Sequence, residues 1–169
     1  ENDLHAQLDV FPVNMIALEK CDITFDKYIA KNDISNAEMC AGLMQVIMTL
    51  ITYQDVFSFT HNDLHTNNIM FSETDRQYLY YKYRDKYYKV PTHGKIYKII
   101  DFGRGIYTYR NKLICSDNFE KNEDAYTQYN FGPIYDTQRT KREPNPSFDL
   151  CRLGCSMIDE FVTRMDELD

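Results

Sequence analysis

Two groups of carboxylate and amide side chains follow one another in an order that suits the transfer of a phosphoryl group. The first group is His61-x-Asp63 with Asn68 five residues after the aspartate, and the second is the Asp-Phe-Gly tripeptide at 101–103. Phosphoryl transfer requires a carboxylate that orients the attacking hydroxyl, oxygen ligands for magnesium and a fixed geometry between them. Asp63 can supply the carboxylate, whereas Asn68 and Asp101 can supply magnesium ligands.

The elements around these residues are predicted by periodicity and capping. Ser35-Asn-Ala-Glu38 has the pattern of a capping box, and apolar residues then recur at helical spacing up to about Phe57. This predicts a long core helix that ends just before His61. A shorter helix is predicted around 25–29, where the apolar residues Phe25, Tyr28 and Ile29 share one face.

Strands are predicted on both sides of the polar, aromatic stretch between the two motifs and at the start of the chain. The apolar runs 68–71 and 97–100 are short and typical of strands, and the apolar run 10–19 also suits a buried strand better than a helix. After Gly105 the chain is polar and irregular up to Pro146, which predicts a long loop. A final helix is predicted from Phe148 to about Leu168.

Size and composition favour one compact domain over residues 1–169. The chain is 43% hydrophobic, and it contains no run of about 18 uncharged apolar residues, so we expect no membrane span. No secretory leader opens the sequence, although its start at Glu1 suggests a segment of a longer polypeptide. The net charge of −7 disfavours nucleic acids and anionic membranes as partners.

The five cysteines do not form the pattern of a zinc ribbon or a disulfide framework. Their number is odd and no C-x-x-C pair occurs, so reduced thiols in a cytosol-like compartment are expected. Cys151 and Cys155 share a helix face, for which buried free thiols are the commoner case. A metal site formed by His61 and His65 lacks a third His or Cys ligand nearby, which disfavours it.

The order of these motifs resembles the protein-kinase superfamily over nearly the whole chain. The resemblance implies that Asp63 is the catalytic-loop aspartate, Asn68 a catalytic-loop metal ligand and Asp101 the metal-binding aspartate. It also implies supporting roles for three neighbours of these groups, namely His61, Phe102 and Gly103. The implied fold class is α+β, a mainly helical C-lobe with small β-hairpins and an N-lobe that is largely absent.

Two further segments carry the resemblance. Asp149-Leu-Cys-Arg-Leu-Gly154 matches the start of the large C-lobe helix, whose aspartate in the family hydrogen-bonds the catalytic-loop backbone near the equivalent of His61. At the front, Met15 to Asp22 resembles the strand and hinge that hold adenine. Leu18 would then be the gatekeeper, and the hinge residues Glu19 to Cys21 would contact ATP, with Glu19 and Cys21 as candidate cofactor-binding residues.

Several departures from the family keep other activities open. Asn62 replaces the arginine of the H-R-D motif, and His65 occupies the position of a lysine that helps hold the transferred phosphate. His65 is therefore a candidate catalytic residue, and the H-x-D-x-H-x-x-N pattern is also similar to small-molecule kinases acting on aminoglycosides or choline. No A-P-E motif follows Gly103, since Phe131-Gly-Pro is a poor substitute, and no glycine-rich loop or lysine–glutamate pair precedes residue 10.

A tyrosine-rich insertion separates Asn68 from Asp101. Residues 75–93 alternate tyrosines with lysines and arginines around Arg84-Asp85, which predicts an extended β-hairpin. Interleaved basic and aromatic residues can contact nucleic acid, but a hairpin that packs on the domain or docks a partner is the preferred interpretation. The H-N-D-L-H-T-N-N-I-M run, this insertion and the I-I-D-F-G-R run together resemble kinase-like proteins of large DNA viruses.

The resemblance implies an ATP- and magnesium-dependent phosphotransferase that acts on Ser or Thr hydroxyls of a protein substrate. Its location would be the cytoplasm of an infected cell or the virion, and the rest of a longer chain could be a partner. The first alternative is an inactive pseudokinase or structural interaction module. The second is a small-molecule kinase.

Overall fold

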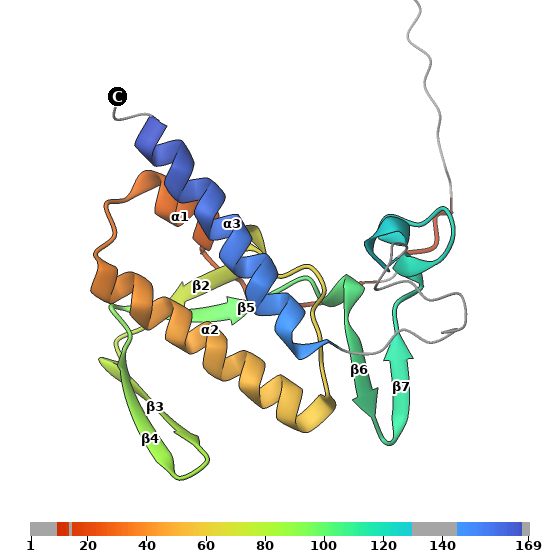
Figure 1. Ribbon diagram of the computed structural model, residues 1–169, viewed down its shortest axis with the longest axis horizontal. Coiled ribbons are helices and arrows are strands. Elements are labelled where there is room, and N and C mark those ends of the chain that lie inside the picture. The colour runs from red at the N-terminus through yellow and green to blue at the C-terminus, as the bar shows by residue number, and fades with distance from the viewer. Residues whose placement is uncertain (1–9, 14, 130–144, 167–169) are drawn as a thin grey trace, which may run out of the picture.

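The computed structural model describes residues 10–13, 15–129 and 145–166, which form an α+β arrangement (Figure 1). Three helices surround a small antiparallel sheet, and two further hairpins extend from this centre. In chain order the elements are β1 (Ile23–Thr24), α1 (Phe25–Lys31), α2 (Asn36–Phe57), β2 (Ile69–Glu73), β3 (Tyr78–Tyr83), β4 (Lys86–Pro91), β5 (Lys95–Ile99), β6 (Ile106–Tyr109), β7 (Lys112–Cys115) and α3 (Pro146–Asp166).

Helix α2 confirms the predicted core helix and half of the predicted capping box. Ser35 is the N-cap, and its Oγ accepts a hydrogen bond from the Glu38 backbone N–H at 3.2 Å. The reciprocal half was wrong, because Glu38 Oε1 instead accepts hydrogen bonds from the Tyr28 hydroxyl at 2.7 Å and Lys95 Nζ at 2.9 Å. A bond to an ammonium group is stronger than one to a backbone amide, so Glu38 joins α1, α2 and β5.

The central sheet has the order β1-β2-β5, with both pairs antiparallel. The predicted strands at 68–71 and 97–100 are confirmed as β2 and β5, which pair from Ile69 opposite Ile99 to Glu73 opposite Lys95. The buried Gln45 of α2 fastens the helix to this sheet. Its side chain accepts from the Tyr97 N–H at 3.0 Å and donates to the Lys95 carbonyl at 3.1 Å.

Gly42 allows α2 to approach β5 closely. A β-carbon built at this position would lie 2.9 Å from ring atoms of Tyr97, which is closer than real contacts of this kind. By length and composition alone α2 could also cross a membrane. In this structure Val46 and Leu50 of α2 are buried against the sheet, which is the arrangement of a core helix.

The main core gathers apolar side chains from α1, α2, the loop before β2, the sheet and α3. Its buried members are Phe25, Ile29, Val46, Leu50, Leu64, Ile69, Phe71, Tyr97, Ile99 and Leu153. The predicted face of α1 is confirmed, since Phe25 and Ile29 are buried and Tyr28 packs at the edge of the core. Leu153 brings α3 onto this core, so the last helix holds the loop that precedes β2.

The insertion forms the predicted hairpin β3–β4, which extends away from the rest of the molecule (Figure 1). Its six cross-strand pairs run from Tyr78 opposite Pro91 to Tyr83 opposite Lys86. One face points inward, where Val90 is buried and β4 packs against α2. The other face is exposed, so the predicted packing on the domain holds for one face of the hairpin only.

The predicted buried strand at 10–19 was wrong. Residues 10–13 and 15–22 have no regular secondary structure, and the large apolar side chains between Val10 and Leu18 are 68–88% exposed. A strand requires a neighbour that pairs with its backbone. Among the described residues, the first backbone hydrogen bond from this part of the chain to the sheet comes from Asp22, whose N–H donates to the Phe71 carbonyl at 3.0 Å. The apolar composition indicated burial but could not supply a pairing strand.

The prediction of a long irregular loop after Gly105 was wrong for its first part. Residues 106–115 form the hairpin β6–β7. Its turn residues Arg110 and Asn111 both have positive φ values, 48° and 61°, which is typical of a tight hairpin turn. Ile106 and Thr60 exchange two backbone hydrogen bonds of 2.9 Å. A small second core forms beside this hairpin from Ile106, Phe119 and Ala125.

The cysteine prediction was right about the free thiols and wrong about their burial. All five cysteines are free, but Cys151 and Cys155 are exposed. Helix α3 turns Asp149 and Leu153 inward, and residues two positions away lie on the opposite side of the helix. The helix end predicted near Leu168 and the Phe131-Gly-Pro segment lie outside the described residues.

Candidate active site

A carboxylate on α3 organises the loop that carries the first motif. Asp149 Oδ2 accepts a hydrogen bond from the His61 backbone N–H at 2.8 Å, and Oδ1 accepts one from the Asn62 N–H at 2.9 Å. Asp149 and His61 are both fully buried. Burial raises the pKa of the Asp149 carboxyl, although the backbone hydrogen bonds from His61 and Asn62 oppose this. The contact implied by the resemblance is therefore present in the geometry.

The ring of His61 connects this loop to the segment that carries the second motif. His61 Nε2 lies 2.8 Å from the Ile100 carbonyl oxygen, and Nδ1 lies 3.3 Å from the Asp63 backbone N–H. A carbonyl only accepts and an amide N–H only donates, so this pair of contacts requires the tautomer with its proton on Nε2. His61 therefore joins the residue before Asp101 to Asp63 itself.

The side chain of Asp63 lies between two basic groups. Its Oδ1 is 3.8 Å from His65 Nε2, a contact that is an ion pair when the imidazole is protonated. Its Oδ2 is 3.5 Å from a guanidinium nitrogen of Arg104. The Asp63 side chain is 20% exposed, so it is still accessible to a substrate group. Asp63 and His65 are thus brought together, as their predicted shared site requires.

Asn68 fixes the other end of the loop. Its Nδ2 donates to the backbone carbonyl oxygen of Asp63 at 2.9 Å, and the backbone carbonyl of Asn68 accepts from the Ile100 N–H at 3.0 Å. These contacts place Asn68 between Asp63 and the residue that precedes Asp101. Since β2 and β5 begin their pairing at Ile69 and Ile99, both motifs meet at this end of the sheet.

Asp101 caps a single turn in an unusual backbone conformation. Its φ and ψ are 61° and 71°, in the left-handed region that costs energy for residues other than glycine. Its Oδ1 accepts from the Gly103 N–H at 3.4 Å, and the residue is exposed. Strained residues of this kind are frequent at functional sites, where the surrounding structure holds them in place.

Phe102 and Gly103 support this turn. The ring of Phe102 packs with its centroid 5.5 Å from that of His61, and it also contacts Tyr53 and Phe59. The Gly103 carbonyl accepts from Asn118 Nδ2 at 3.0 Å. Phe102 therefore lies against the first motif, whereas Gly103 is held within the turn and by Asn118.

Glu19, Cys21 and Gly154 are the remaining candidates. Glu19 forms an ion pair with Lys98 of β5, which places its side chain beside the sheet, and Cys21 is half-buried close to β1. At Gly154, on α3, a β-carbon would meet no described atom within 4 Å, and its supporting role stays a prediction. Helix α3 contributes to the site through Asp149.

The sequence did not predict the contacts that Asn62 and Arg104 make in the candidate site. The sequence identified Asn62 only as a departure from the family. In the structure its Nδ2 donates to the Arg104 carbonyl at 2.8 Å, and its backbone carbonyl accepts from Gln128 Nε2 at 2.6 Å. Its φ of 67° suits asparagine better than most residues. Arg104 directly follows the second motif, and this adjacency was the only sequence signal for its contact with Asp63.

Asn68 and Asp101 have donor atoms that fit a magnesium ion. Asn68 uses its amide nitrogen for Asp63, which leaves its side-chain oxygen without a hydrogen bond from the described residues. Asp101 uses one carboxylate oxygen for Gly103 and is exposed. Protein magnesium sites usually combine one or two protein oxygen ligands with water and phosphate oxygens, and these two side chains offer oxygen atoms of that kind.

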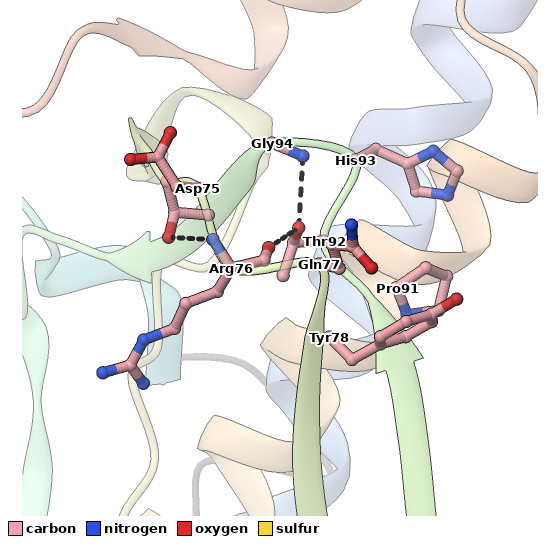
Figure 2. Close-up of a pocket in the computed structure, with 9 residues that line it drawn as sticks. Asp75, Arg76, Gln77, Tyr78, Pro91, Thr92, His93 and Gly94 are labelled. Carbon is pink, nitrogen blue, oxygen red and sulfur yellow. Dashed lines mark hydrogen bonds between the residues drawn. The ribbon is translucent and has the colours of Figure 1, made fainter.

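A separate hollow of about 390 Å³ lies at the opposite end of the β2–β5 ladder (Figure 2). It is lined by the segments 74–78 and 91–94 at the base of the β3–β4 hairpin. Thr92 joins the two segments, because its hydroxyl donates to the Arg76 carbonyl and accepts from the Gly94 N–H at 3.2 Å. Glu73 and Lys95 mark this end of the ladder, so the hollow is remote from Asp63.

Comparison with known proteins gives a kinase-like relationship. No protein-family description matches the chain. The chain is similar to a protein of Acanthamoeba polyphaga mimivirus named "Putative serine/threonine-protein kinase", with 32% identity over 143 residues. The match covers 66% of this chain and 36% of the mimivirus protein, so the chain spans about a third of the length of that relative.

Proposed function

We propose that the chain forms the catalytic-loop part of an ATP- and magnesium-dependent phosphotransferase of the protein-kinase type. The observation that carries this proposal is the double hydrogen bond from the backbone of His61 and Asn62 to Asp149, at 2.8 and 2.9 Å. This contact holds Asp63 and Asn68 beside the segment that leads to Asp101. The similarity to a viral protein named as a serine/threonine kinase supports the same class.

In the proposed reaction Asp63 orients a Ser or Thr hydroxyl of a protein substrate and accepts its proton. Asn68 and Asp101 hold magnesium, which neutralises phosphate charge when it is bound. His65 and Arg104, at 3.8 and 3.5 Å from the Asp63 carboxylate, place positive charge where a transferred phosphate would carry negative charge. Each of these roles uses a side chain already held by its neighbours.

The proposal extends to the fold and the location. The described helices and sheet would be a kinase C-lobe, and Glu19 to Cys21 would contact adenine through backbone groups, since the Glu19 side chain is paired with Lys98. A viral relative supports a location in the cytoplasm of an infected cell or in the virion.

The test is transfer of labelled γ-phosphate from ATP to casein, with Asp63→Asn and Asp101→Asn as the loss variants. Asp117→Asn is the matched control, because Asp117 is also an exposed aspartate that begins a short 3-10 turn. Wild type and control should transfer phosphate, and both loss variants should be at least about 100-fold slower. Transfer that persists in either loss variant would contradict the assigned roles.

A binding role without transfer is favoured by one observation, the pair of contacts that His65 and Arg104 make with Asp63. A substrate hydroxyl must displace or share these contacts. If wild type transfers no phosphate, calorimetry with ATP and magnesium is the next measurement. Binding without transfer would support the binding role. Kanamycin and choline as acceptors in the same assay test the small-molecule alternative, which His65 favours.

A further inference from the structure

The outer face of the β3–β4 hairpin presents an ordered mixture of tyrosine and lysine side chains. Alternate residues of each strand point to this face, which we call the outer face and define as Tyr78, Tyr80, Lys82, Tyr87, Lys89 and Pro91. All six residues are exposed. Tyr80 and Tyr87 are 73% and 78% exposed, so these large rings are not packed on the domain.

The cross-strand register sets tyrosine against lysine on this face. Tyr80 lies opposite Lys89, and Lys82 lies opposite Tyr87. Lys82 Nζ is 5.6 Å from the centroid of the Tyr87 ring, and Lys89 Nζ is 3.9 Å from that of Tyr78. Such cation–π contacts keep flexible lysine side chains close to the sheet, so their charges are presented in a fixed pattern.

The charge of this hairpin is opposite to that of the whole chain. Between 78 and 91 the hairpin carries Lys82, Arg84, Lys86 and Lys89 against the single acidic residue Asp85, whereas the net charge of the chain is −7. A basic surface that projects from an acidic protein attracts an acidic group to that place and repels it elsewhere.

We propose that the outer face is a docking surface for an acidic segment of a partner protein in an extended conformation. Carboxylates of the segment would pair with Lys82 and Lys89, and tyrosine hydroxyl groups would donate hydrogen bonds to it. A single-stranded nucleic acid fits this face less well. Bases stack on open aromatic faces, but Lys89 lies over the Tyr78 ring at 3.9 Å. A long polyanion would also meet the acidic remainder of the chain, whose net charge is −7.

The proposal does not depend on phosphotransfer, so it is tested by binding alone. The probe is a fluorescein-labelled decapeptide of alternating glutamate and serine, and binding to the full chain is followed by fluorescence anisotropy at low salt. The charge-reversed variant is Lys82→Glu with Lys89→Glu. Both side chains are exposed, so the variant should fold, and an unchanged circular dichroism spectrum and thermal midpoint check this.

The matched control is Lys112→Glu with Lys121→Glu, which changes the net charge equally at two exposed lysines outside the hairpin. We expect the outer-face variant to bind the peptide at least about tenfold more weakly than wild type, and the control to lose at most about twofold. Equal loss in both variants, no binding by wild type, or tighter binding of a ten-residue oligothymidylate than of the peptide would each overturn the proposal.

Discussion

Asp149 holds the backbone of His61 across 88 residues of sequence, and both residues are fully buried. The bond joins α3 to the loop before β2, and the same carboxylate also accepts from Asn62. Two buried N–H groups therefore depend on one side chain. Helix α3 therefore helps to hold the loop that carries Asp63.

The first prediction concerns this contact. Asp149→Ala leaves two buried N–H groups without an acceptor, and each such group costs about 1–3 kcal/mol. We expect the free energy of unfolding to fall by about 2–5 kcal/mol, measured by urea denaturation. Asp117→Ala, at an exposed aspartate, serves as the control and should change stability little. Equal stability of the two variants would show that Asp149 does not support the loop.

The second prediction concerns pH and Glu38. Burial opposes ionisation, but hydrogen bonds from Lys95 and Tyr28 and the charges of Lys95 and His93 hold the pKa of Glu38 below its ordinary value. A carboxyl whose pKa is lowered by folding stabilises the fold at pH values above its ordinary pKa. This contribution disappears as the pH falls through the pKa of the folded state.

Glu38→Gln should therefore reduce stability by about 1 kcal/mol at pH 7 and by much less near pH 3. Urea denaturation at both pH values measures the difference, with Glu123→Gln as the exposed control. A loss that is the same at both pH values would mean that the charge of Glu38 contributes nothing.

The third prediction uses two helical glycines with opposite surroundings. Gly42→Ala should destabilise by about 1–3 kcal/mol, because the added methyl group meets the buried Tyr97 ring at 2.9 Å. Gly154→Ala meets no described atom within 4 Å and should stabilise α3 by up to about 1 kcal/mol. Thermal unfolding of both variants decides the matter. Changes of the same sign would contradict the packing described for one of the two sites.

The fourth prediction concerns Asn62, where the resembled family has arginine. Asn62 is 1% exposed, has a positive φ of 67° and bonds the Arg104 carbonyl. Asn62→Arg should therefore destabilise by about 2–4 kcal/mol, since a larger, charged side chain loses hydration there. Chemical denaturation measures this, and Asn122→Arg is the control at an exposed asparagine with a φ of 75°. Equal losses would assign the effect to backbone conformation rather than burial.

The fifth prediction rests on the proposed phosphotransfer. If His65 supplies positive charge near Asp63, His65→Lys should keep most of the activity and His65→Ala should lower the transfer rate by about tenfold or more. Rates of γ-phosphate transfer at several pH values test this, because lysine removes any rate change that comes from imidazole titration. A fully active His65→Ala would leave the residue without a role.

Local sequence was sufficient for the elements whose pattern is regular. The cap at Ser35 and the apolar periodicity after it predicted α2, short apolar runs predicted β2 and β5, and alternation predicted the β3–β4 hairpin. These signals are reliable because helix hydrogen bonds and hairpin turns join residues close in sequence. Within the site, spacing and resemblance selected Asp63, Asn68 and Asp101, and the resemblance also anticipated the contact of Asp149 with the loop.

The tertiary structure decided what depends on distant neighbours. The predicted run 10–19 has the composition of a strand, but its large apolar side chains at 10–13 and 15–18 are exposed, because a strand exists only where another strand pairs with it. Arg104 reaches Asp63, and Asn62 bonds the Arg104 backbone, only because the chain returns to the same place about forty residues later. By itself, the sequence determined which groups could do chemistry. Only folding decided which of them share a site, since side-chain contacts of this length follow from packing and not from local pattern.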